Sequence, residues 1–281
     1  MNITVVVPTK NRPGLLIQCL NGLYCQSSRG FDVIVCDDNS DYDVAALVRA
    51  HPLGRLTDVT VIRNPGTGAG SARDCAAAKA SGDVLALLDD DAVPDEHWIA
   101  VIEREMSSST EKAITGRILP LQTSLLSRCR QSRYEARQRA AVATRDVDFM
   151  AGGNSAIGRS TFLELGGFDA KFLMMHDAEL SQRMKARGIP CLYVADLVIH
   201  HMHVKTAIEP FQNAFNSGRF RWALAKNYPD RKLRPLREWN SIVANIAGSA
   251  SEDPLDVRVM NSFLHCIHLL GHARAQISGM L

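Results

Sequence analysis

The sequence predicts an α/β protein: a sheet flanked by helices over the first ~205 residues, then a helical extension. Two observations support this prediction. Short apolar runs of strand length alternate with amphipathic helical patterns over the first ~90 residues, which is typical of βαβ units. From about residue 206 onward, apolar residues recur only at helical spacing. We therefore expect two domains, residues 1–205 and residues 206–281.

The composition is that of an ordinary globular protein. The 281 residues are 46% hydrophobic and 22% charged, with a formal net charge of +2, which gives no general argument for binding nucleic acid. The seven cysteines are scattered and contain no Cys-x-x-Cys pair, which favours free thiols in a reducing compartment. The sequence shows neither a leader nor an apolar run of bilayer length, so we expect a cytoplasmic protein without a transmembrane segment.

The most informative stretch is a predicted strand that ends in three consecutive acids. Residues 84–88 form an apolar run, Asp89, Asp90 and Asp91 follow it, and Pro94 prevents the strand from continuing. Neighbouring carboxylates repel one another unless water or a cation offsets the repulsion, and Mg²⁺ or Mn²⁺ prefers oxygen ligands. The triplet therefore predicts a metal-assisted phosphate site, although an isolated triplet fits a solvated acidic turn equally well.

A second acid-tipped strand precedes the triplet. The predicted elements of this region are strands at 3–7, 31–36 and 59–62 and helices that begin near Pro13, Val44 and Gly68. The strand at 31–36 stops at Asp37 and Asp38. Because the carboxyl ends of parallel strands meet at one edge of a sheet, these acids should lie near the triplet, where ligands of open α/β sheets collect.

A glycine-rich turn enters the helix before the triplet. Its glycines, at 66, 68 and 70, permit close approach of the backbone to a ligand. A dinucleotide fingerprint would need a glycine where this chain has Ser71 or Arg73, so we set that reading aside.

The region after the triplet contributes further glycines and a run of histidines. The predicted elements are strands at 114–119, 147–150, 191–195 and 197–199 and helices carrying Trp98, residues 124–143 and Asp177. Gly152 and Gly153 indicate either backbone near a ligand or a bulge. His200 and His201 are neighbours on a strand and point to opposite faces, so we expect only one of them to join Asp91 on a metal.

In this order, the motifs resemble those of the family 2 inverting glycosyltransferases, which have the GT-A fold. The matching motifs are Val7-Pro8-Thr9-Lys10-Asn11-Arg12, Asp37-Asp38-Asn39-Ser40, Gly68 to Asp74, Asp89-Asp90-Asp91, Gly152-Gly153-Asn154, Gly166-Gly167-Phe168-Asp169 and His176-Asp177-Ala178-Glu179-Leu180. The resemblance covers about the first 205 residues. It implies a Rossmann-like mixed sheet flanked by helices, with the helical extension outside the family's signatures.

The resemblance also implies a role for each matching residue. Asp177 would be the catalytic base, and Asp91 would hold the metal together with His200. The residues implied to bind the nucleotide sugar are Pro8, Thr9, Asn11, Arg12, Asp38, Arg73, Asp89 and Asp90. Those implied on the acceptor or sugar side are Gly153, Asn154 and His176. The family usually has Glu immediately before its catalytic Asp, whereas this chain has His176.

The implied reaction moves a sugar from a nucleoside-diphosphate sugar, with UDP as the expected nucleotide, to the hydroxyl or amine of a small-molecule or glycan acceptor. Mn²⁺ or Mg²⁺ would stabilise the leaving diphosphate, and Asp177 would take the acceptor proton in a single inverting displacement. The C-terminal helices would form the acceptor side or a homodimer interface. A sugar-phosphate nucleotidyltransferase and a non-catalytic nucleotide-sugar binding protein stay open as alternatives.

Overall fold

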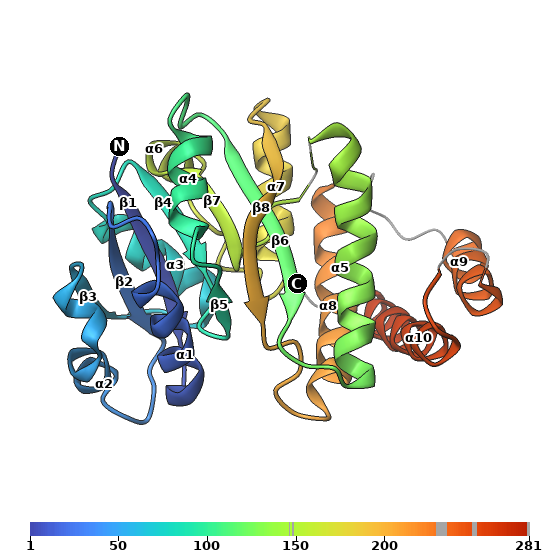
Figure 1. Cartoon of the computed structure of the whole chain (residues 1–281). Helices are drawn as coiled ribbons and strands as arrows, with labels where there is room; N and C mark the ends of the chain where they lie inside the picture. Colours follow the sequence, from blue (N-terminus) through green and yellow to red (C-terminus); the bar gives the residue numbers. More distant parts are fainter. Residues whose placement is uncertain (146, 148, 229–234, 249–251, 280–281) are drawn as a thin grey trace. The chain divides into compact units, whose positions relative to one another are not determined.

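The computed structural model describes residues 1–145, 147, 149–228, 235–248 and 252–279, and the chain forms two compact units (Figure 1). Unit 1 comprises Met1–Leu119 and Gln138–His201, and unit 2 comprises Pro120–Arg137 and Met202–Leu281. The division at residue 201 falls close to the domain boundary expected at residue 205. The sequence pattern did not indicate that residues 120–137 group with the C-terminal helices.

An eight-stranded mixed sheet forms the centre of unit 1, in the order β3-β2-β1-β4-β7-β6-β8-β5 (Figure 1). The strands are β1 (Ile3–Thr9), β2 (Phe31–Asp37), β3 (Val59–Arg63), β4 (Val84–Leu88), β5 (Ala92–Pro94), β6 (Ala113–Pro120), β7 (Asn154–Gly158) and β8 (Cys191–His201). The first four in chain order are parallel, whereas β7 runs antiparallel to both β4 and β6. The expected mixed sheet is confirmed.

Short helices connect these strands and supply the core. They are α1 (Pro13–Tyr24), α2 (Val44–Ala50), α3 (Gly68–Lys79), α4 (Trp98–Met106), α6 (Arg159–Glu164) and α7 (His176–Ala186), with a 3₁₀ turn, η1 (Pro52–Arg55). Small alanines on α3, including Ala72 and Ala76, pack with Leu85 and Leu87 of β4 in one buried cluster. Because these side chains are small, α3 lies close to the sheet, and its first turn begins beside the carboxyl ends of the strands.

One local prediction was wrong. We expected a strand at 147–150; residue 148 lies outside the described range, and Phe149 and Met150 are not in a strand. The strand forms instead at β7, where Asn154 pairs with Leu88 and Gly158 pairs with Val84. We expected Pro94 to prevent the strand at 84–88 from continuing; β4 ends at Leu88, and Pro94 is the last residue of a separate strand, β5, where it pairs with Ile199. Proline is tolerated there because β5 is the edge strand of the sheet.

Unit 2 consists of helices. They are α5 (Leu125–Thr144), whose last seven residues belong to unit 1, and α8 (Glu209–Asn227), α9 (Pro235–Ala247) and α10 (Leu255–Ser278). A β-carbon at Gly218 of α8 would overlap the carbonyl oxygen of His268, and one at Gly271 of α10 would overlap that of Phe215. These two helices therefore touch through their backbones. Of the helices described, none is both long and apolar enough to span a bilayer.

Candidate active site

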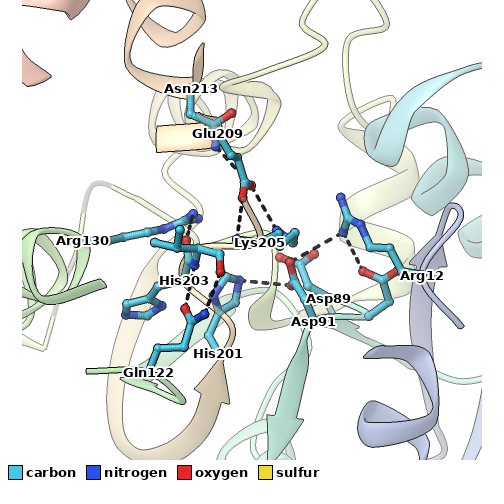
Figure 2. A network of polar contacts seen from close by, with 12 residues as sticks. Arg12, Asp89, Asp91, Gln122, Arg130, His201, His203, Lys205, Glu209 and Asn213 are labelled. Atoms are coloured by element: carbon cyan, nitrogen blue, oxygen red, sulfur yellow. Dashed lines mark hydrogen bonds and ion pairs between the residues drawn. The ribbon is translucent and has the colours of Figure 1, made fainter. Parts of the chain in front are cut away.

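The three aspartates after β4 have separate environments. Asp90 is 2% exposed and accepts hydrogen bonds from the Thr9 hydroxyl at 2.8 Å and from Nη1 of Arg12 at 2.9 Å. Burial raises the pKa of Asp90 to about 6, and the Arg12 guanidinium opposes that rise. Nη1 of Arg12 also lies 3.6 Å from Oδ2 of Asp91 (Figure 2). Asp90 thus joins the end of β4 to the end of β1.

A histidine completes a cluster with the other two aspartates. Pairing of β5 with β8 sets His201 opposite Ala92, the residue after Asp91. Nε2 of His201 consequently lies 3.1 Å from Oδ1 of Asp91 (Figure 2). Asp89, Asp91 and His201 each offer one ligand atom, and these atoms lie within 4.8 Å of one another. Two carboxylate oxygens and one imidazole nitrogen form a donor set that fits Mn²⁺ or Mg²⁺.

The prediction placed His200 beside Asp91, and the structure places His201 there instead. Alternation along β8 explains the difference. Leu197 and Ile199 are fully buried, and His201, two residues further on, is 4% exposed. His200 pairs with Val93 and points to the other face of the sheet. Continuing the buried alternation from Leu197 would have identified His201 from the sequence.

The paired glycines lie between the acidic cluster and the expected base. A β-carbon at Gly153 would overlap the carboxylate of Asp89, so a larger residue here would displace Asp89. A β-carbon at Gly152 would lie 3.5 Å from the β-carbon of Asp177. The backbone amide of Gly152 lies 3.5 Å from Oδ2 of Asp177. Asp89 and Asp177 therefore flank the same two glycines.

Asn154 does not line the site, contrary to its expected place on the acceptor or sugar side. The side chain is fully buried. Its amide group donates to the carbonyl oxygens of Arg117, at 2.9 Å, and Leu197, at 3.0 Å, and its oxygen accepts from the indole of Trp98 at 2.9 Å. All three contacts are internal, so Asn154 joins β7 to its neighbours in the sheet.

Arg73 connects the acidic cluster to the start of α7. Its side chain is 3% exposed; one terminal nitrogen contacts Asp89, and the other lies 2.9 Å from Nε2 of His176. Since a guanidinium can only donate, Nε2 of His176 accepts and the imidazole is neutral. Burial also lowers the pKa of His176, which agrees with this assignment. The guanidinium carbon of Arg73 lies over the Phe168 ring, 5.8 Å from the ring centroid.

Asp177 lies in the first turn of α7, where the exposed amides of a helix favour an anion. Its Oδ1 accepts from the amide of Ala178 at 2.8 Å. The side chain is only partly buried, so it is accessible to a ligand. Met175, just before the helix, has a φ of 61°, an unusual value for a residue other than glycine. Such backbone conformations cluster at functional sites.

Five of the expected nucleotide-binding residues, Pro8, Thr9, Asn11, Arg12 and Asp38, lie at or just after the ends of β1 and β2. Asp38 is 6% exposed and accepts from the Asn64 amide at 2.7 Å and from the Gly68 backbone at 3.0 Å. Gly68 has a φ of 90°, which favours glycine at this turn. Thr9 and Pro8 are buried at the end of β1. The amide side chain of Asn11 exchanges hydrogen bonds with Asp41, at 2.8 and 2.7 Å, and so holds two loops together.

Asp74 is a residue that the sequence analysis did not single out. Its Oδ1 accepts from the backbone amide of Phe168 at 2.9 Å, and a β-carbon at Gly167 would clash with the same carboxylate. Asp74 therefore fixes the loop that carries Phe168 against Arg73. The paired glycines at 166 and 167 were the signal available in the sequence. Both have positive φ values in the structure, and the amides of such a loop need an acceptor.

We expect Asp74→Asn to stabilise the protein at neutral pH. Burial raises the pKa of Asp74 to about 6, from an ordinary value of 3.8. The folded state thus binds this proton more tightly than the unfolded chain, and the stabilisation present at low pH is lost as the pH rises through about 6. Asparagine keeps the acceptor without the charge. The variant should gain on the order of 1 kcal/mol above pH 7, and little at pH 4.

Melting temperatures measured from pH 4 to pH 8 would check this prediction, with Asp58→Asn, an exposed carboxylate of unit 1, as the control. Parallel pH profiles for the wild type and Asp74→Asn would contradict it.

Comparison with known proteins agrees with this geometry. The model of the family described as Glycosyl transferase family 2 matches residues 4–166. An O-antigen chain rhamnosyltransferase of Salmonella typhimurium is 27% identical over 233 residues, which cover 78% of this chain and 72% of the relative. A pre-mycofactocin glycosyltransferase of Mycobacterium tuberculosis is 26% identical over 249 residues, which cover 84% of this chain but only 50% of the relative.

Solved structures share the fold. The mannosyltransferase PcManGT from Pyrobaculum calidifontis, solved in complex with GDP-Man and Mn²⁺, superposes with a TM-score of 0.72 at 19% identity, covering 99% of this chain and 87% of the other. GalNAc-T7 with UDP, GalNAc and Mn²⁺ gives a TM-score of 0.59 at 18% identity, covering 90% and 58%.

The mixed sheet, the Asp-x-Asp motif at its edge and these similarities define a glycosyltransferase with the GT-A fold. Since the family model matches more than half of the chain, the protein belongs to glycosyltransferase family 2.

Proposed function

We propose that this enzyme transfers a sugar from a nucleoside-diphosphate sugar to an acceptor hydroxyl or amine, with inversion and with Mn²⁺ or Mg²⁺. The observation that carries the proposal is the position of the glycine pair. Gly153 packs against Asp89 of the candidate metal cluster, and Gly152 lies against Asp177. A candidate metal ligand and a candidate base therefore border one short stretch of backbone, which carries no side chains to obstruct a sugar.

We base the proposed role of each residue on its contacts. Asp89, Asp91 and His201 would hold the metal ion, which supplies Lewis-acid stabilisation of the negative charge that develops on a leaving diphosphate. Arg12 holds Asp90 and lies near Asp91, so it maintains the spacing of the acids. Asp38, fixed by Asn64 and Gly68, is available to a nucleotide at the adjoining strand end.

Asp177 would act as the base. Its partly exposed carboxylate can accept a proton from an acceptor hydroxyl, and the Ala178 amide orients it from Oδ1. We propose no covalent intermediate with the enzyme, since one base and one displacement suffice for the reaction. A single displacement inverts the configuration at the anomeric carbon. The proposed inversion therefore requires that Asp177 acts as a base and that no enzyme nucleophile takes part.

The nucleotide is the part of the proposal that most needs a test. We expect UDP, while the solved relatives carry GDP-Man in one case and UDP in another. Thermal shifts should be measured with UDP, GDP, dTDP and CDP, each with and without Mn²⁺. A ligand at ~100 times its dissociation constant stabilises the native state by about 2.7 kcal/mol, which raises Tm by several degrees.

The proposal predicts a shift for one nucleotide that requires the metal. Donor hydrolysis or transfer with the same nucleotide sugar would then distinguish a transferase from a non-catalytic binding protein. If no nucleotide raises Tm with or without Mn²⁺, the donor site proposed here is wrong. Release of pyrophosphate from a nucleoside triphosphate would favour a nucleotidyltransferase instead.

A further inference from the structure

Helix α10 of unit 2 carries a stripe of exposed apolar side chains. Leu255, Val259, Phe263, Leu270 and Ile277 are 59%, 49%, 54%, 64% and 88% exposed. Single exposed apolar residues are normal on a protein surface. Five of them lie along one side of a single 24-residue helix, and exposed apolar surfaces of that kind mark interaction sites.

The stripe extends along one face of α10. Six apolar residues follow one another at intervals of four, three, four, three and four: Val259, Phe263, Cys266, Leu270, Ala273 and Ile277. These five intervals span 18 residues and average 3.6, the period of an α-helix, so the six residues stay on one face of α10 along its length. We call these six residues the α10 seam.

The opposite face of α10 is already occupied by α8. Gly271 touches the α8 backbone at Phe215, and Nδ1 of His268 lies 2.9 Å from the hydroxyl of Ser217. Leu264 of α10 is 1% exposed on this inner side. The α10 seam is therefore a second face of the helix, and it borders the inner face at Phe263, whose ring centroid lies 6.2 Å from that of Phe211 of α8.

We propose that the α10 seam pairs with the α10 seam of a second copy of this chain, forming an antiparallel, two-fold symmetric homodimer. The five exposed side chains present roughly 500 Å² of accessible surface per chain. Two copies would therefore bury on the order of 1,000 Å² in total, which is in the lower range for a specific interface. With a two-fold axis that crosses the helix, each chain presents the same stripe to the other. Both stripes are then covered, so the assembly ends at two chains.

Side-chain sizes favour the antiparallel direction. With the axis at residue 268, the pairs across the interface are Val259 with Ile277, Phe263 with Ala273, and Cys266 with Leu270. The large ring of Phe263 then meets the smallest residue of the seam, which is the alternation that close packing needs. A parallel pair would set Phe263 against its own copy and leave a gap at Ala273.

The oligomeric state tests the proposal directly. Sedimentation equilibrium of the full chain should give twice the 30.9 kDa of one chain at micromolar concentration. Leu270→Arg places two charges in the seam and should weaken the dimer at least tenfold. The matched control is Leu163→Arg, at an apolar residue of unit 1 that is 42% exposed, and it should stay dimeric. Matching far-UV circular dichroism spectra for the two variants would exclude misfolding.

Cysteine cross-linking tests the direction. In a Cys25→Ser background, which removes an exposed thiol, the double variant Phe263→Cys with Ala273→Cys should form cross-linked dimers under a mild disulfide oxidant. Cys266 alone should not, because it faces Leu270. Cross-linking through Cys266 would mean a parallel pair and would overturn the proposed direction.

Two results would overturn the dimer itself. One is a wild-type mass of a single chain across 1–100 μM, and the other is an unchanged dimer in Leu270→Arg. Flotation of a monomeric wild type with anionic lipid vesicles, lost in Leu270→Arg, would instead assign the seam to a membrane surface. None of these outcomes depends on the sugar donor, so they leave the proposed reaction untouched.

Discussion

Asp177→Asn should abolish sugar transfer while nucleotide binding stays intact. The asparagine keeps the size of the side chain and an oxygen that can accept from the Ala178 amide, so α7 should fold as before. An amide cannot take a proton from an acceptor hydroxyl at neutral pH. The loss in kcat is expected to be about 10²- to 10⁴-fold, the usual contribution of a general base.

The measurement is initial-rate transfer beside the Mn²⁺-dependent thermal shift of the matching nucleotide. Asp196→Asn provides a matched control, since its carboxylate on β8 is 71% exposed and should leave both quantities unchanged. Near wild-type turnover in Asp177→Asn would remove Asp177 from the reaction and with it the argument for its inverting role.

Asp91→Asn should remove the response to metal. Asp91 is 5% exposed and lies 3.1 Å from His201 and 3.6 Å from Arg12, so its carboxylate is central to the cluster. Neutralising it takes away one of two anionic ligands, and an amide oxygen is a much weaker ligand for a hard cation. We expect the thermal shift with nucleotide and Mn²⁺ to vanish and transfer to fall at least 10²-fold.

Direct metal binding, measured by calorimetry with Mn²⁺ alone, separates this effect from a loss of nucleotide contacts. His201→Ala should weaken Mn²⁺ binding in the same assay, whereas His200→Ala should leave it unchanged. The opposite ranking of the two histidines would show that the cluster proposed here is not the metal site.

Strand alternation and acid-tipped strands made most of unit 1 predictable. β4 has the predicted bounds, and β1, β2 and β3 each extend the predicted strand by only one or two residues. These strands could be predicted from the sequence because parallel strands are continuous apolar runs that end in polar residues. The motifs then indicated Asp91, after β4, and Asp177, in the first turn of α7, as residues of one site.

Contacts between distant segments were not predictable. The resemblance implied that Asn154 lies on the acceptor or sugar side, but only the positions of Arg117, Leu197 and Trp98 reveal that its amide is used in contacts inside the protein. β5 is three residues long and contains a proline, so its pairing with β8 leaves no local signal. That pairing is what selects His201 over His200.

The hydrogen bond between Arg73 and His176 joins two motifs that are 103 residues apart in the chain. It constrains how this sequence can be recombined with others. A chimera that keeps Arg73 but imports a helix beginning with Glu-Asp would replace a neutral acceptor with an anion. Arg73 would then be shared between that anion and Asp89. Exchanging both motifs together preserves the charge balance, so a library built by crossover should cut the gene outside residues 73–176.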